Sequence, residues 1–209
     1  MLDFEEILAR NRKATEKSGF KGFVPLKLVI FVKSIFPLFL LVCLGFTCSP
    51  NLINGLDSQT KDSVSRTQTY VNWVNENTID QKRFERGPKE NFTVYYNHVK
   101  EIIRLDRLIK DGAIQKEFKF YLLNNFLVYS ENLTSNTAKV KNHCLLDAKQ
   151  HYFSQEKAIF AAQKTESYKN CDQKAILKFE KKPYKNLEIS QYIYKDEMAI
   201  IEKLKNFIK

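Results

Sequence analysis

The feature that most constrains this chain is an apolar run from Leu26 to Phe46. It reads LKLVIFVKSIFPLFLLVCLGF, and only two lysines and a serine interrupt it. About 20 mostly apolar residues, each rising 1.5 Å along a helix, cross a hydrocarbon layer of roughly 30 Å. We therefore predict a single transmembrane helix over residues 25–48, preceded by a short basic tail at residues 1–24.

A cleaved signal peptide is the alternative interpretation of the same run. The part after Lys33 has the length of a signal-peptide core, which is roughly 7–15 residues. Against cleavage, a long segment with helical character precedes the run, and the cleavage site is poor because Gly45, Thr47 and Ser49 alternate with Phe46, Cys48 and Pro50. An uncleaved anchor is therefore the favoured interpretation.

Basic residues on either side of the run predict its orientation. Six stand before it or at its start and two follow it closely: Arg10, Arg12, Lys13, Lys17, Lys21 and Lys27, against Lys61 and Arg66. The positive-inside rule then places the N-terminus in the cytoplasm or matrix, and the C-terminal domain in the periplasm, intermembrane space or lumen. Inside the run, Lys33 either extends its stem to the near interface or contacts a carboxylate on a partner helix.

Composition favours helices in the remainder of the chain. The 209 residues include only six glycines and five prolines, against usual frequencies of about 7% and 5%. Tight β-turns and active-site loops both use glycine, so its scarcity indicates helices joined by short links. We predict a mainly α protein, with a stalk and first helix over residues 49–90 and a helical soluble domain over residues 91–209.

Two apolar stripes with steps of three and four residues predict a helical hairpin. The first stripe is Tyr95, His98, Ile102, Leu105 and Ile109, and the second is Ile114, Phe118, Tyr121, Leu122, Phe126 and Tyr129. Asp111 and Gly112 separate them as a tight link. On this interpretation His98 is a hydrogen-bonded core histidine.

Three further elements follow in the predicted domain. A third helix is expected over about residues 137–165, and a short β-hairpin is expected where AILKFE and LEISQYIY flank KKPYKN. The last segment, DEMAIIEKLKNFIK, is typical of an amphipathic helix. Its apolar stripe either packs on its own domain, which is the favoured interpretation, or docks on a partner helix or an anionic membrane surface: Met198, Ile201, Leu204 and Ile208.

Few residues suggest a chemical site. Cys144 and Cys171 can form a disulfide in an oxidising compartment, but the spacing does not show whether their Cα atoms come within reach. His143, Asp147 and His151 would share one face of the predicted third helix, yet about 12 Å between the first and last is too far for one metal ion. No nucleophile elbow or glycine-rich phosphate loop occurs, so we expect no catalytic, cofactor-binding or metal-binding residues.

The expected function follows from this layout. A basic chain of net charge +10 favours anionic neighbours, including anionic lipid headgroups, while no motif indicates nucleic-acid binding. We expect a single-pass, non-enzymatic structural or assembly subunit of a multiprotein membrane complex, in a bacterial envelope machine or the mitochondrial inner membrane. Its partners would be other proteins of that complex and the lipid bilayer. The alternative is a membrane-perturbing or lysis-regulating protein, similar to holins in architecture alone.

Overall fold

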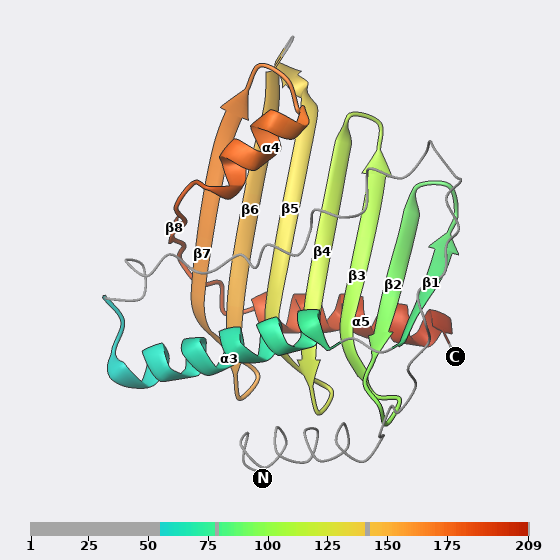
Figure 1. Cartoon of the computed structure of the whole chain (residues 1–209), viewed down its shortest axis with the longest axis vertical. Helices are drawn as coiled ribbons and strands as arrows, with labels where there is room; N and C mark the ends of the chain where they lie inside the picture. Colours follow the sequence, from blue (N-terminus) through green and yellow to red (C-terminus); the bar gives the residue numbers. More distant parts are fainter. Residues whose placement is uncertain (1–54, 78–79, 141–142, 209) are drawn as a thin grey trace, which may run out of the picture. The chain divides into compact units, whose positions relative to one another are not determined.

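The computed structural model describes residues 55–77, 80–140 and 143–208, all of which belong to one compact unit. Its centre is an eight-stranded antiparallel sheet in which every strand pairs with the next one along the chain (Figure 1). The strands are β1 (Asp80–Arg86), β2 (Glu90–Tyr96), β3 (Ile102–Asp111), β4 (Ile114–Leu123), β5 (Phe126–Val140), β6 (His143–Ser154), β7 (Lys157–Tyr168) and the short β8 (Lys185–Asn186). The prediction of a mainly α fold is therefore wrong.

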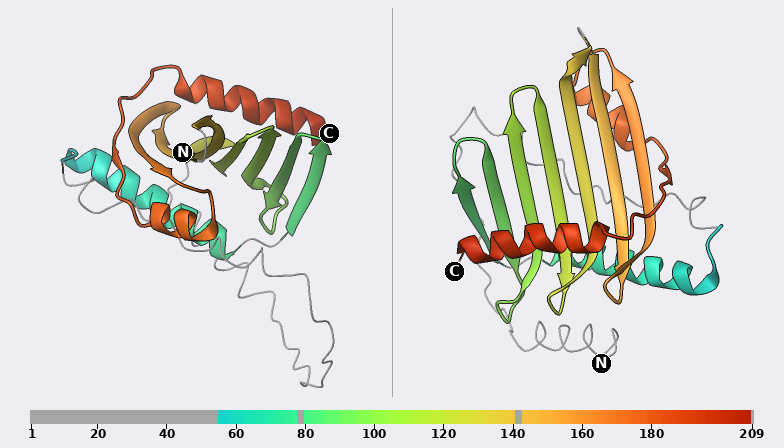
Figure 2. Two further views of the ribbon diagram at one scale, coloured as in Figure 1. Left: turned by 90° about the horizontal axis from the view of Figure 1, so that it is seen from above. Right: turned by 180° about the vertical axis from the view of Figure 1, so that it is seen from behind.

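Helices cover both faces of this sheet (Figure 2). The C-terminal helix α5 (Ile193–Ile208) lies on one face, which we call the α5 face. Helices α3 (Ser58–Glu76) and α4 (Gln173–Glu180) lie on the opposite face, which we call the α4 face. Because both faces are covered, apolar residues occur on both, and the alternation expected of a half-exposed strand is weakened.

The α5 face carries a hydrophobic core. Ile201 and Leu204 of α5 are buried against side chains from β2 to β6: Phe92, Val94, Leu105, Phe120, Leu122, Leu127 and Phe153. Met198 and Ile208 are partly buried against the same cluster. All four apolar residues of the predicted C-terminal stripe thus pack within their own domain.

On the opposite face, helix α3 begins with a side-chain cap and is attached to the sheet by a tyrosine. The Asp57 side chain accepts a hydrogen bond from the Thr60 amide at 3.0 Å, which caps the helix. The Tyr70 hydroxyl donates to the carbonyl of Leu122, next to an irregularity in the pairing of β4 with β5. A carbonyl beside such a bulge lacks a regular ladder partner, so this tyrosine both satisfies it and fixes α3 on the sheet.

Several hairpin turns use residues other than glycine. Asn124 and Asn125, between β4 and β5, have φ angles of 52° and 66°. Gln155 and Glu156, between β6 and β7, have φ angles of 49° and 62°. Two successive positive φ angles are the geometry that matches the twist of a two-residue β-hairpin. The scarcity of glycine was therefore a poor argument against tight turns.

The remaining sequence predictions are corrected element by element. The first predicted helix of the hairpin is β2 and β3, and the second is β4 with the start of β5. The predicted third helix is the end of β5, β6 and most of β7, whereas the predicted β-hairpin contains α4 and the start of α5. His98, predicted in the core, is exposed in the link between β2 and β3.

The membrane prediction is corrected as well. Within the described ranges, none of the helices combines the length and the apolar character needed to cross a bilayer. This finding overturns the assignment as a single-pass membrane protein with its N-terminus inside and its C-terminal domain outside. The predicted span at 25–48, with Lys33, lies outside the residues that the structure describes.

Candidate functional site

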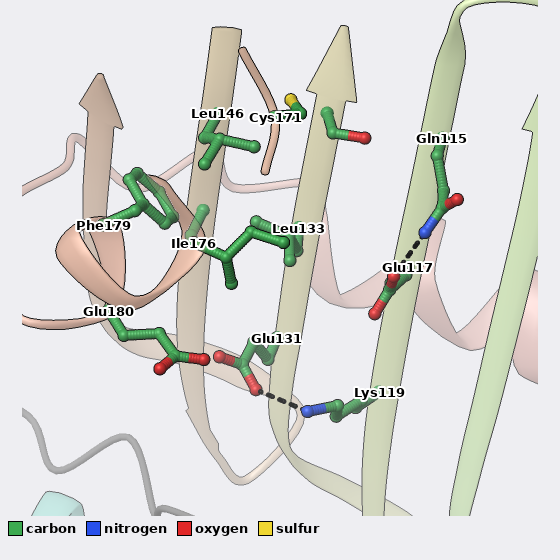
Figure 3. Close-up of a pocket in the computed structure, with 12 residues that line it drawn as sticks. Gln115, Glu117, Lys119, Glu131, Leu133, Leu146, Cys171, Ile176, Phe179 and Glu180 are labelled. Carbon is green, nitrogen blue, oxygen red and sulfur yellow. Dashed lines mark hydrogen bonds and ion pairs between the residues drawn. The ribbon is translucent and has the colours of Figure 1, made fainter. Parts of the chain in front are cut away.

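A cavity of about 280 Å³ lies on the α4 face, between α4 and strands β4, β5 and β6 (Figure 3). We call it the α4 cavity. The residues that line it come from all four elements and the segment before α4: Gln115, Glu117, Lys119, Glu131, Leu133, Ser135, Leu146, Ala148, Cys171, Ile176, Phe179 and Glu180.

Strand register places these side chains together. Lys119 of β4 is directly opposite Glu131 of β5, and Leu133 of β5 is directly opposite Ala148 of β6. Residues that face one another across an antiparallel pair project to the same side of the sheet. Alternate residues over a short stretch of each strand therefore form the floor of the cavity.

The cavity combines an apolar floor with charged side chains. Lys119 Nζ lies 3.6 Å from Glu131 Oε2, and both side chains are largely buried. Burial is the largest single influence and opposes the charged form of Lys119, but Glu131 together with Tyr121 and Asp106 outweighs it, and the pKa of Lys119 is raised. This pair is therefore a charged one.

Two further carboxylates line the cavity without a direct ion pair among the described residues. Glu117 accepts a hydrogen bond from the Gln115 amide nitrogen at 2.6 Å. The Glu180 carboxylate points toward that of Glu131 in Figure 3, and it forms no ion pair with the residues that the structure describes. Three carboxylates and the Lys119 ammonium group thus line the cavity, and the ammonium group of Lys164 lies near two of the carboxylates, Glu131 and Glu180.

Helix α4 is fixed over the cavity at both ends. At its start, the Asp172 side chain accepts a hydrogen bond from the Ala175 amide at 2.8 Å, and a disulfide joins Cys171 to Cys144 of β6 with 5.3 Å between the Cα atoms. At its end, the Lys164 ammonium group donates to the Glu180 carbonyl at 3.1 Å. A short helix of eight residues has little stability alone, so these attachments hold the roof of the cavity in place.

Lys164 also lies against two aromatic rings. Its Nζ is 4.8 Å from the ring centre of Phe179 and 4.5 Å from that of Tyr184. Burial lowers the pKa of Lys164 to about 8, although Glu131 and Glu180 act in the opposite direction. The charged form is therefore held by rings, a carbonyl and neighbouring carboxylates rather than by water.

Next to the cavity, the polar side chain of Gln150 is completely buried. It stands on β6 directly opposite Glu131, and neither atom of its amide group has a hydrogen-bond partner among the described residues. A buried polar group without a partner costs free energy that an apolar side chain would not. Gln150 on the α4 face, like the Glu197 Oε2 atom on the α5 face, is thus an exception, among the described residues, to the rule that buried polar groups are hydrogen-bonded.

The opposite face contains a serine, a histidine and a glutamate in contact. Ser130 Oγ lies 3.3 Å from His151 Nδ1, and Glu197 Oε1 lies 3.0 Å from the same nitrogen. A catalytic triad needs the two oxygens on different ring nitrogens, so that one nitrogen receives the serine proton while the other is held by the acid. This cluster is therefore a buried contact that fixes α5 to the sheet.

The residues singled out in the sequence are dispersed in the structure. His143, Asp147 and His151 all occur on β6, where eight residues of strand separate the first from the last by roughly 26 Å. Within the described ranges, no group of three or more His, Cys, Asp or Glu side chains could hold a metal ion. Cys144 and Cys171, in contrast, are joined as described above.

The lining of the α4 cavity was missed in the sequence. Glu117, Glu131 and Glu180 are far apart along the chain and meet only through strand pairing and the return of α4. A local signal was nevertheless present, because Gln115, Glu117 and Lys119 alternate with apolar residues at every second position.

Comparisons with known proteins identify no relative. No family model, curated protein or solved structure matches this chain. The function must therefore be inferred from the geometry of the site itself.

Proposed function

We propose that this protein is a non-enzymatic binding domain that serves as a structural or assembly subunit of a multiprotein complex. In this proposal the α4 cavity receives part of a partner protein. The observation that carries the proposal is a cavity with an apolar floor and more carboxylates than ammonium groups, covered by a helix that is attached at both ends. Concave sites that combine apolar lining with a few polar groups are typical of binding sites.

An exposed apolar side chain at the rim of the cavity supports the proposal that the partner is a protein. Ile176 of α4 lines the cavity, yet 41% of its surface is exposed. A large apolar side chain at the mouth of a pocket can contact the partner around the inserted group. Residues that surround an interface hot spot exclude water from it in the same way. The cluster of Ser130, His151 and Glu197 supports the non-enzymatic part of the proposal, because its geometry is that of a structural contact.

Photocrosslinking in native cells tests this function. A diazirine side chain close in size to isoleucine is placed at Ile176 of the full chain, and in a second variant at Ile189, which is 39% exposed and does not line the cavity. We expect one defined crosslinked partner from position 176 and none of the same product from position 189.

A cavity-filling variant makes the test specific. In Ala148→Leu the added side chain projects into the cavity, so the crosslink from position 176 should disappear while the circular dichroism spectrum is unchanged. If this variant does not fold, Ser135→Leu fills the same space from β5. Equal crosslinking from both positions, or a crosslink that survives filling, would contradict the proposal.

A further inference from the structure

We infer that the α4 cavity binds the side chain of a lysine or arginine from a partner protein. This inference rests on the proposed function and specifies the chemistry of the same site. It is carried by the meeting of three carboxylates, one ammonium group and an apolar floor in a space that holds a single long side chain.

The charges of the cavity call for a cation. Glu131 is paired with Lys119, and the Lys164 ammonium group acts on both Glu131 and Glu180, so three carboxylates are balanced by two ammonium groups. Glu117 has only the Gln115 amide. Carboxylates that point toward one another in a partly buried site repel, and a cation between them removes this repulsion. An ammonium or guanidinium group would also receive charge-assisted hydrogen bonds, which are among the strongest in proteins.

The apolar lining calls for an alkyl stem rather than a bare ion. Leu133, Leu146 and Phe179 form much of the surface beside the carboxylates. The side chains of lysine and arginine combine three or four methylene groups with a charged tip, and they bury the first while the second contacts polar groups. A metal ion would gain nothing from this lining.

The size of the cavity limits its occupant. Pockets for drug-sized molecules and cofactors have volumes of about 300–1,000 Å³. At about 280 Å³ the α4 cavity lies at the lower end of this scale, which suits one side chain. A side chain inserted into a pocket is also the usual form of an interface hot spot, where arginine is enriched.

The charge of the whole chain restricts the sequence around that side chain. The chain has a net charge of +10, so a strongly basic segment would be repelled at long range. The cavity therefore favours an isolated lysine or arginine whose neighbours in the partner are neutral or acidic.

Binding of capped amino acids to the isotope-labelled full chain tests this inference. The probes are the N-acetyl, N′-methylamide derivatives of lysine, arginine, norleucine and glutamate, with putrescine as a free amine. We expect lysine or arginine to shift the amide NMR signals of Ala148, Ile176 and Phe179, with an affinity about tenfold higher than that of norleucine. Glutamate should not shift them.

Matched variants identify the carboxylate responsible. Glu180→Gln should weaken the binding of the lysine derivative about tenfold and leave norleucine binding unchanged. Glu188→Gln, an exposed residue outside the cavity lining, should change neither. Because Glu180 is only partly buried, its substitution should not unfold the protein.

The results separate this inference from the proposed function. A crosslink from position 176 together with equal binding of lysine and norleucine would overturn the cationic ligand and leave the binding function in place. Putrescine binding more tightly than either capped basic residue would also overturn the inference, because the ligand would then be a free amine. Failure of the crosslink with preserved lysine binding would contradict the proposed function alone.

Discussion

The two faces of the sheet differ in the side chains that they bury. On the α5 face, aromatic and aliphatic side chains such as Phe92 and Phe120 pack against Ile201 with almost no exposed surface. On the α4 face, Lys119 and Glu131 line a cavity, and carboxylates outnumber the basic groups there. The same strands supply both faces, so one sheet carries a closely packed hydrophobic core on one side and a cavity lined by charged side chains on the other.

The largest effect on this comparison should come from the α5 face. Phe120 is fully buried there, and Phe120→Ala removes a ring from the centre of the core. We expect the free energy of unfolding to fall by about 3–5 kcal/mol, measured by urea denaturation. Phe126→Ala, at a position that is 53% exposed, should change it by less than about 0.5 kcal/mol. Similar losses in both variants would show that α5 does not cover the main core.

The disulfide should be the main stabilising element of the α4 face. It closes a loop with a sequence separation of 27, and in the chain-entropy model a loop of this size contributes about 3.5 kcal/mol. Replacing both Cys144 and Cys171 by alanine should remove this contribution and increase amide hydrogen exchange in α4 while β2–β4 remain protected. A reducing agent should destabilise the original protein but not the double variant. Unchanged exchange in α4 would contradict its role as an anchor.

Alkaline pH should stabilise the α4 face over a narrow window. Burial lowers the pKa of Lys164 from 10.5 to about 8, so above pH 8 the unfolded chain retains a proton that the folded protein has released. Stability then rises with pH, by at most about 2 kcal/mol once solvent screening is allowed for. Measurements should stop below pH 10, because burial raises the pKa of Tyr70 above the ordinary 10.0 and tyrosine ionisation then favours unfolding.

Lys164→Met provides the control for this window. The variant has no ammonium group to titrate, so its stability between pH 8 and 9.5 should be flat relative to the original protein. A rise of the same size in the variant would assign the effect to another group.

The smallest effect should be a gain in stability at the unpaired amide. Gln150→Met replaces a buried amide that has no hydrogen-bond partner with an apolar side chain of similar length, and we expect a gain of up to about 1 kcal/mol in thermal or urea unfolding. Gln163→Met is the matched control, since the amide of Gln163 donates to Asp147 and Thr165 and its loss should destabilise the protein. A loss at position 150 would indicate that its amide is satisfied after all.

The C-terminal helix was predictable from sequence, whereas the sheet was not. Met198, Ile201, Leu204 and Ile208 follow one helical face, and α5 is found there. In the strands, side chains such as Phe118 and Tyr121 are partly or wholly buried on opposite faces. Because both faces are covered, apolar residues occur at spacings of three as well as two along the strands, and this spacing resembles that of a helix.

Turn chemistry explains the remaining error in the fold. Asn124 with Asn125, and Gln155 with Glu156, adopt positive φ angles without glycine, so two hairpins lack the strongest sequence signals, Asn-Gly and Asp-Gly. The Asp-Gly pair at Asp111 and Gly112 is such a signal and does join β3 to β4, but it was interpreted as a link between helices. The cavity could not be derived either, because Glu180 reaches Glu131 only through the return of the chain across β6 and β7. The pairing of Cys144 with Cys171 likewise depends on how the chain returns across the sheet after β7.

The sequential strand order has a consequence for synthesis of the protein. Each strand pairs with its neighbour along the chain, so hairpins can close in succession as they are made, with little loop entropy to overcome. Helix α5 follows all eight strands, and until it is made Phe92 and Phe120 have no cover on their side of the sheet. A nascent or C-terminally truncated chain should therefore attract chaperones or aggregate, although its hydrogen-bonded sheet is already complete.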